Sequence, residues 1–414
     1  MALLIFIISY FFFATGWRER TIAAMAGALA VLATGILSAN EALNYVDLNS
    51  LGILFGMMVV VGVLKEAGFF NWLGIHIANL VRCNPIYMFI LFMMVTGLLS
   101  AFLDNVTTVL FMTAVIMDIS EVLEVYPMPY IVGAIIASNI GGSATLVGDI
   151  PNIMIASAAR IGFTSFIANL GPAALLCLLI SIIITYVYFR DMLPKDIEYL
   201  KVPISPSEAV NDPRLFRMGS LIFLATVVLF FMQDRVGLAP ASIALGSAIL
   251  LLFIGGPKMP AILERIEWST LIFFGCLYII VGSLEKTGVV QALTSIIAPL
   301  THVWPPILAT VILWVSAVAS AFIDNVPFTA AFIPIIQGLD APGNNLLWWA
   351  LALGTGFGGN GTIIGSSASI VAIGIASKRG IEISFKDFMK IGMLILAVTT
   401  FLGNLMLILR YYLT

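Results

Sequence analysis

The chain has 414 residues, of which 61% are hydrophobic and 10% are charged, and its formal net charge is −3. A water-soluble domain needs more polar surface than this, so the composition predicts a polytopic membrane protein. Basic patches with interleaved aromatic residues are absent, which excludes nucleic acid as a partner. The cysteines Cys83, Cys177 and Cys276 have no metal-ligand spacing, and His76 and His302 are single and far apart, so we expect no metal site and no cofactor.

Ten apolar stretches can cross a bilayer, although the first is short for a crossing of about 20 residues. The only long polar segment, 191–214, contains four prolines and is predicted to be a cytoplasmic linker between two halves. In chain order, the stretches lie near 1–16, 20–38, 50–66, 129–148, 164–190, 215–233, 238–255, 268–286, 346–364 and 386–412.

A longer apolar block, 85–118 and 303–338, lies between the third and fourth crossing of each half, with an Asp-Asn pair in its middle. A straight helix would place that carboxylate in lipid. A hairpin that enters and leaves on one side holds its non-helical tip inside protein or a wet cavity, where such backbone is tolerated. We therefore expect one re-entrant helical hairpin in each half.

The two halves share duplicated phrases. Ser100-Ala-Phe-Leu-Asp-Asn-Val106 and Ser320-Ala-Phe-Ile-Asp-Asn-Val326 stand 220 residues apart and match at six of seven positions. Five crossings in each half are an odd number, which forces the halves into opposite orientations. The predicted fold is thus an all-α polytopic membrane protein of about ten transmembrane helices. These form two inverted repeats, 1–190 and 215–414, each with a re-entrant hairpin and a discontinuous helix.

The distribution of positive charge predicts the orientation. With the N-terminus outside and the 191–214 loop in the cytoplasm, fifteen of the 19 Lys and Arg residues, Arg18 and Arg20 among them, fall on the cytoplasmic side. We expect a multi-pass protein of a bacterial inner membrane. The segments 69–82 and 288–301 are interpreted as arms that lie along the membrane interface.

Each half also contains a broken helix, at 129–160 and 346–377. In the first, Pro151 cannot continue a helix without losing a hydrogen bond. In the second, five glycines within eight residues disfavour an unbroken helix. A break leaves unpaired carbonyls and amides that can bind a small cation or hydroxyl groups. We expect both breaks and both hairpin tips to meet near the membrane midplane.

Ionisable groups inside a membrane are functional candidates. We assign proton or ion coupling to Asp104, Asp324 and Asp149. Asp149 aligns with Ser366, so it is an acid present in only one half, as a proton carrier would be. No Lys or Arg in the broken segments offsets these acids, which disfavours a dianion. The predicted substrate-binding residues are Asn105, Thr107, Thr108, Asn139, Gly142, Ser143, Thr145, Asn325, Gly359, Asn360, Thr362 and Ser366.

These motifs resemble the ion transporter superfamily, and more closely its arsenite permease, P-protein and NhaD-type sodium/proton antiporter branch. The resemblance rests on Ser100 to Thr108 and on Asn139-Ile-Gly-Gly-Ser-Ala-Thr-Leu-Val-Gly-Asp-Ile-Pro-Asn152, and it covers both halves. It implies an elevator mechanism, a homodimer, and arsenite or antimonite efflux coupled to proton entry, with an arsenical-pump ATPase as a partner. The Asp-Asn-Val tips differ from the Ser-Asn-Thr tips of the sodium-coupled dicarboxylate branch.

Three other functions are weighed against arsenite efflux. Sodium/proton exchange would use the same acids, with sodium in place of the metalloid. Anion or dicarboxylate transport is a further alternative. An intramembrane aspartyl protease is disfavoured because Val147-Gly148-Asp149 lacks the first glycine of the usual GxGD phrase. We expect a transporter rather than an enzyme.

Overall fold

The computed structural model describes residues 1–15, 17–194, 205–255, 259–264, 266–297, 303–339 and 345–413. All regular elements in these ranges are helices. Part of the predicted linker, at 195–204, lies outside the described residues, as do His302 and four of the predicted cytoplasmic basic residues, at 195, 201, 258 and 265.

Helices of the first half follow the predicted apolar stretches closely. The fourth stretch is divided, because helix ends at Gly142 and resumes at Ile150. In order, the helices are α1 (Ala2–Thr15), α2 (Arg20–Ala33), α3 (Ala39–Tyr45), α4 (Leu48–Glu66), α5 (Phe69–Leu80), α6 (Pro85–Ser100), α7 (Asn105–Val122), α8 (Met128–Gly142), α9 (Ile150–Ala159) and α10 (Phe163–Phe189).

The second half repeats this order of long elements. A short 3-10 helix, η1 (Pro206–Ala209), precedes it, and α4 and α14 begin and end 220 residues apart. The helices are α11 (Pro213–Val236), α12 (Pro240–Gly255), α13 (Met259–Glu264), α14 (Trp268–Lys286), α15 (Val289–Ile297), α16 (Pro305–Phe322), α17 (Asn325–Leu339), α18 (Leu346–Gly358), the 3-10 helix η4 (Ile363–Gly365), α19 (Ser367–Lys378) and α20 (Phe385–Leu413).

By length and composition, seven of the described helices can cross a membrane: α4, α7, α10, α11, α14, α16 and α20. The prediction of an all-helical polytopic protein is therefore confirmed, whereas the count of ten crossings and the inverted repeat stay predictions. The first two stretches form helices of only 14 residues each. Both are shorter than the roughly 20 residues that a crossing requires.

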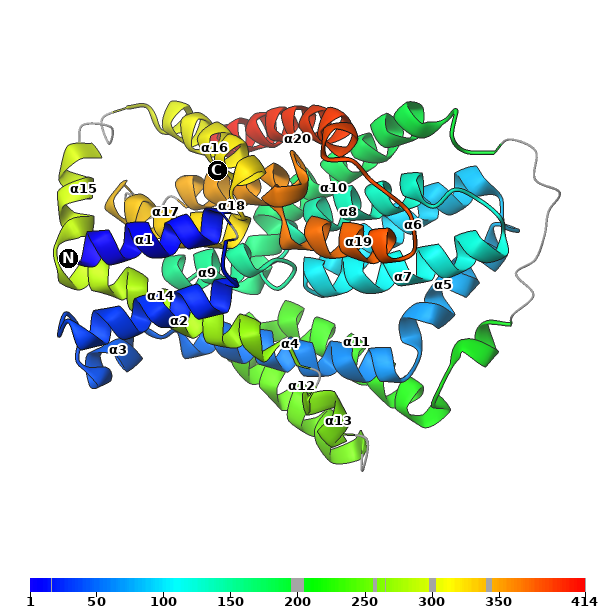
Figure 1. Cartoon of the computed structure of the whole chain (residues 1–414), viewed down its shortest axis with the longest axis horizontal. Helices are drawn as coiled ribbons and strands as arrows, with labels where there is room; N and C mark the ends of the chain where they lie inside the picture. The colour runs from blue at the N-terminus through cyan, green and yellow to red at the C-terminus, as the bar shows by residue number, and fades with distance from the viewer. Residues whose placement is uncertain are drawn as a thin grey trace.

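The helices pack into two groups. In the first bundle, α2 packs on α14, and α12 packs on α4 and α11. In the second bundle, α16 packs on α18, α6 on α8, and α10 on α8 and α20. In Figure 1, α2, α4 and α12 lie low in the view and α16, α18 and α20 lie high. Helices α5 and α15 stand at opposite ends of the long axis.

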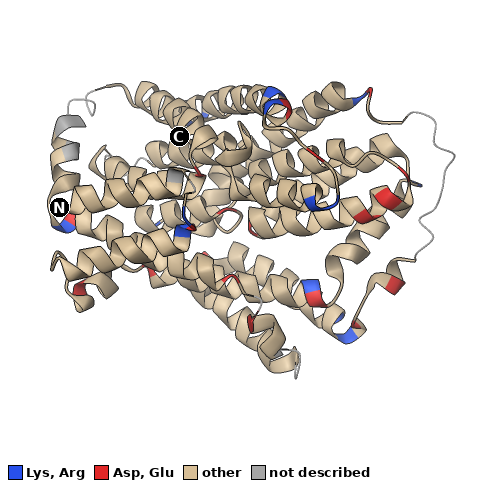
Figure 2. Ribbon diagram, in the orientation of Figure 1, with Lys and Arg blue, Asp and Glu red and all other residues tan. Residues whose placement is uncertain are grey.

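Charged residues are sparse along the helices and lie mostly near helix ends (Figure 2). A small group of them instead lies near the middle of the molecule, beside the link between α1 and α2. Interior charge requires a partner or a wet cavity. The charged residues beside the link between α1 and α2 are therefore candidates for a functional site.

Local sequence explains the turn of each hairpin and the break of each helix. Asp104 caps α7 by accepting a hydrogen bond from the Thr107 N–H at 2.8 Å. Asp149 caps α9, whose second residue is Pro151, so the helix begins there and does not continue from α8. Capping carboxylates satisfy amides that have no partner within the helix. The capping residues Asp104 and Asp149 thus determine where the helices of these apolar segments begin.

Close backbone contact joins the hairpin of the first half to its broken helix. A Cβ on Gly141 of α8 would stand 2.0 Å from the Gly97 carbonyl oxygen of α6. We expect Gly141→Ala to lower the free energy of unfolding by about 1–3 kcal/mol through overpacking. Thermal unfolding of the purified protein in detergent measures this, with Gly246→Ala as the control.

Gly246 has no heavy atom within 4 Å of an added Cβ. Alanine also favours a helix more than glycine does, so this control is expected to keep or raise the melting temperature. Equal melting temperatures for the two variants would contradict the close packing of α6 on α8.

Candidate functional site between the two bundles

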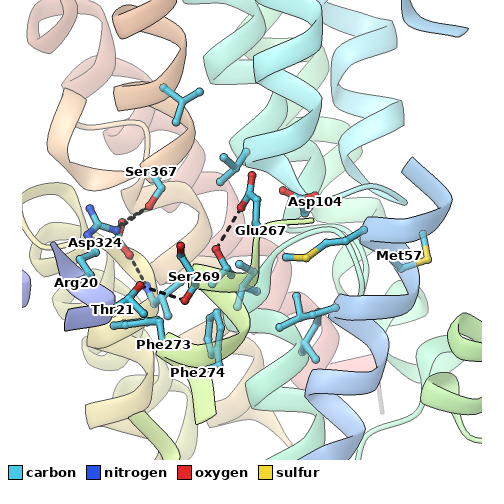
Figure 3. A pocket seen from close by; sticks show the side chains of 18 of the residues that line it. Arg20, Thr21, Met57, Asp104, Glu267, Ser269, Phe273, Phe274, Asp324 and Ser367 are labelled. Carbon is cyan, nitrogen blue, oxygen red and sulfur yellow. Dashed lines mark hydrogen bonds and ion pairs between the residues drawn. The ribbon is translucent and has the colours of Figure 1, made fainter. Parts of the chain in front are cut away.

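Both hairpin acids line one cavity. Asp104 and Asp324 belong to the wall of a space of about 240 Å³, which Figure 3 shows from close by. Asp324 lies at one side of this cavity, and Asp104 lies at the other, beside Glu267. The hairpin tips are thus not separated by solid packing. We call this space the central cavity.

The central cavity lies between the two bundles. The first bundle contributes the start of α2, one face of α4 and the first turns of α14. The second bundle contributes both hairpin tips, the start of α9 and part of α19. Its ionisable wall residues are four carboxylates, from Glu19, Asp104, Glu267 and Asp324, and one guanidinium, from Arg20.

Asp324 is held by a cation from the other bundle. Arg20 Nη1 donates to Asp324 Oδ2 at 2.7 Å and lies 2.8 Å from Ser367 Oγ. Ser367 Oγ donates to the same Oδ2 at 2.7 Å, and the Val326 N–H donates to Oδ1 at 3.1 Å. The sequence argument found no base in the broken segments, but the structure supplies one from α2. Arg20 thus lines the cavity, and its predicted placement on the cytoplasmic side of the membrane stays a prediction.

Asp104 has a different environment. Among the described residues its Oδ1 accepts the Thr107 N–H, and no ion pair involves it. A second cavity of about 140 Å³ includes Thr107 and Lys65, and it shares Met58 and Glu267 with the central cavity. Glu267 therefore stands where the two spaces meet.

A third cavity, of about 370 Å³, is lined by Tyr45, Tyr278 and Glu285 among others. None of the described residues in its wall also lines the central cavity. In this conformation the central cavity shares wall residues with the second cavity, which includes Lys65. It shares none with the third cavity, which includes Glu285.

Asp149 lies behind the cavity wall and is 3% exposed. Its Oδ2 accepts a hydrogen bond from Asn325 Nδ2 at 3.1 Å, and its Oδ1 accepts the Ile150 N–H at 2.9 Å. The acid of the first broken helix therefore contacts the hairpin tip of the second half. Its neighbours Val147 and Ile150 reach the cavity.

A buried amide network joins the two breaks. Asn139 Nδ2 donates to Asn360 Oδ1 at 3.1 Å, and Ser366 Oγ donates to Asn139 Oδ1 at 3.0 Å. The Asn360 Nδ2 group has no hydrogen-bond partner among the described residues. These three residues come together as predicted, but none of them lines the central cavity.

In each half, one threonine joins the break to the hairpin by a hydrogen bond. Thr145 Oγ1 donates to the Ala101 carbonyl, and Thr362 Oγ1 donates to the Ala321 carbonyl. Asn105 is buried, and its carbonyl accepts a hydrogen bond from Ser138 Oγ. The side chains of Thr145, Thr362 and Ser138 thus hold the hairpin tips in place.

The remaining predicted substrate residues also lie around the tips and breaks. Thr108 is buried with a hydroxyl that has no partner among the described residues. Ser143 Oγ donates to the Asn139 carbonyl at 2.9 Å. Gly142 is buried where an added Cβ would meet the Gly148 carbonyl at 2.9 Å, and Gly359 is the C-cap that follows the last residue of α18. None of these lines the central cavity either, so their roles in binding stay predictions.

Sequence reasoning missed Arg20, Glu267 and Ser367 as cavity residues. A signal for Glu267 was present, because Asp47 stands 220 residues earlier and both acids immediately precede long helices. No comparable signal identified Arg20. Its partner is 304 residues away in the chain.

Comparison with known proteins agrees with a transporter. The family model for the citrate transporter, CitMHS, matches residues 10–354. An uncharacterized transporter of Mycobacterium tuberculosis is 35% identical over 422 residues, covering 100% of this chain and 98% of the relative. The human P protein is 30% identical over 477 residues, covering 93% of this chain and 57% of that protein.

A solved structure has a similar fold. The crystal structure of the Alcanivorax borkumensis YdaH transporter matches with a TM-score of 0.61 at 13% identity, covering 93% of this chain and 89% of that one. The resemblance expected from the motifs is therefore confirmed at the level of the superfamily, while the arsenite branch stays a prediction. The chain belongs to the CitMHS citrate transporter family and is a polytopic membrane transporter.

Proposed function

We propose that this protein is a secondary transporter of a bacterial inner membrane that exports arsenite or antimonite in exchange for protons. The observation that carries the proposal is the shared cavity of Asp104 and Asp324, in which four carboxylates face one guanidinium. Carboxylates that face water inside a membrane protein can load and release protons. No described residue of the cavity wall is a histidine that would do this instead.

The charge of the cavity supports the choice of substrate class. Excess carboxylates repel a free dianion or trianion, whereas a neutral hydroxylated solute is not repelled. Arsenious acid is such a solute, and its hydroxyl groups can donate to Asp104 and Glu267. We choose arsenite over other neutral solutes because the hairpin and broken-helix motifs resemble the branch that contains the arsenite permeases, the P proteins and the NhaD-type antiporters.

Alternating access follows from the two bundles. We propose that the second bundle moves against the first, as in an elevator, and carries the hairpin tips with it. Support for inverted repeats comes from the matching bounds of α4 and α14, from the paired threonine bonds to Ala101 and Ala321, and from the positions of α5 and α15 at opposite ends. An inverted repeat places equivalent gates on opposite sides of the membrane.

Uptake into everted membrane vesicles tests the function directly. With the interior acidified, the proposal expects radioactive or mass-quantified arsenite to accumulate only in vesicles that contain the protein. Collapse of the pH gradient with a protonophore should stop the accumulation. Vesicles that fail to accumulate arsenite or antimonite under an imposed gradient would refute the proposed substrate.

Sodium/proton exchange is the second candidate, and the excess of carboxylates in the cavity favours it specifically. Oxygen ligands from Asp and Glu suit a hard cation. The same vesicles separate the two candidates, because addition of sodium would then raise the internal pH and arsenite would have no effect. Accumulation of citrate or a dicarboxylate would instead favour an anion carrier, and it would contradict the charge argument.

A further inference from the structure

One ion pair crosses the boundary between the bundles inside the central cavity. Arg20 belongs to α2 of the first bundle, and Asp324 belongs to the hairpin tip of the second. Their side chains are 30% and 2% exposed. Figure 3 shows the guanidinium, the carboxylate and the Ser367 hydroxyl in mutual contact. Other ion pairs, Lys286 with Glu41 and Arg379 with Asp118, join helices on the same side of this boundary.

The pair is present in one half only. Asp104 is the counterpart of Asp324 in the duplicated phrase, and it has no ion pair among the described residues. The residue 220 positions after Arg20 is Pro240, which begins α12 and carries no charge. The two hairpin acids therefore differ. One is neutralised by the protein itself, and the other faces the open cavity.

Separation of this pair has a physical consequence. A buried carboxylate that loses its only cation is left as an uncompensated charge, which is strongly unfavourable. Movement of the second bundle along the first would pull Asp324 away from Arg20. Movement of the empty carrier is therefore opposed until another partner, such as a proton or a transported cation, replaces the guanidinium at Asp324.

We propose that Arg20 is a coupling residue, whose tethered guanidinium occupies Asp324 in the empty carrier and competes there with the proton or cation that drives transport. This inference rests on the movement of the bundles proposed above. It makes Asp324 the acid that prevents movement of the empty carrier. Asp104 remains the acid open to solute. The ionisable groups that face Asp324 are Tyr10, Glu19, Arg20, Asp104, Asp149 and Glu267.

Competition between Arg20 and a proton at Asp324 predicts the direction in which the pH profile of transport activity shifts when Arg20 is replaced. Arg20→Gln removes the competitor of the coupling ion at Asp324, so this variant should keep its activity to a higher pH than the wild type. Arg20→Lys retains the charge and should stay close to the wild-type profile. Arg18→Gln is the matched control, because Arg18 is an exposed neighbour with the same charge.

The pH profile of activity is measured as solute counterflow in proteoliposomes from pH 5 to pH 9. The solute is the one that the wild type is found to exchange. On an Asp324→Asn background, Arg20→Gln should cause no further shift, because the competition needs the carboxylate. An unshifted profile for Arg20→Gln, or the same shift on the Asp324→Asn background, would overturn the inference.

A second readout needs no transported solute and keeps the inference testable if the proposed substrates fail. Spin labels at Leu250 on α12 and Leu409 on α20 report the separation of the bundles, since both side chains are exposed. After replacement of the three cysteines, we expect acidification to change the distance distribution of the wild type. Arg20→Gln should reach that distribution at a higher pH, and Arg18→Gln should not. Identical pH responses for all three proteins would rule out the competition.

Discussion

Asp104→Asn is expected to abolish arsenite resistance in a sensitive bacterial host while the protein is made and inserted normally. Asparagine keeps the side-chain oxygen that accepts the Thr107 N–H, so the cap of α7 survives. The charge that faces the cavity is lost. A hydrogen bond to a charged group contributes about 1.5–3 kcal/mol, so affinity for the solute should fall by roughly ten- to hundredfold.

Asp118→Asn is the matched control for this variant. Asp118 lies on the same helix but its side chain is 55% exposed, and it pairs with Arg379 at 2.5 Å. Growth in graded arsenite and the amount of protein in the membrane are measured together. Asp118→Asn should keep resistance. Full resistance with Asp104→Asn, at equal protein level, would remove Asp104 from the mechanism.

Asp149→Ser is expected to separate solute exchange from proton coupling. Serine is the residue at the corresponding position of the second half, Ser366, which caps α19 by accepting the Ala368 N–H. Serine caps helices about as well as aspartate, so α9 should still begin at the break. The substitution thus removes the acid that is present in the first break and absent from the second.

The expected result has two parts. Counterflow of arsenite without a pH gradient should continue, because Asp104 and Asp324 still line the cavity. Accumulation driven by an imposed pH gradient should fall to the level of empty liposomes. Asp191→Ser replaces an acid whose side chain is 81% exposed and should change neither measurement. Gradient-driven accumulation at the wild-type rate in Asp149→Ser would show that the proton travels elsewhere.

Much of the fold could be predicted because its signals are local. The apolar stretches near 50–66 and 268–286 became α4 and α14, within two residues at each end. Asp104 lies at the predicted tip, since a capping acid inside an apolar block marks a helix start. The first broken helix divides between Gly142 and Ile150, where Pro151 and the glycine-rich phrase predicted a break.

Other features escaped the sequence for identifiable reasons. Helices α1 and α2 are each shorter than the stretches that predicted them, because apolar composition does not indicate where a helix ends. Helix α3 begins with a capping box between Ser38 and Glu41, a signal that was present but was not used. Among the predicted substrate residues, Thr145 and Thr362 bond the backbone of the hairpin tips, since short polar side chains bond neighbouring backbone as readily as a ligand.

The sequence by itself determined that this is a helical membrane transporter, and it predicted two related halves, each with an acid-amide hairpin tip and a broken helix. Composition and repeated phrases carry that information along the chain, where it can be read without coordinates. Only the tertiary structure decided which acids share a cavity, and that Arg20 neutralises Asp324 but leaves Asp104 open. An ion pair between residues 304 positions apart depends on how two bundles pack, and no local pattern encodes that packing.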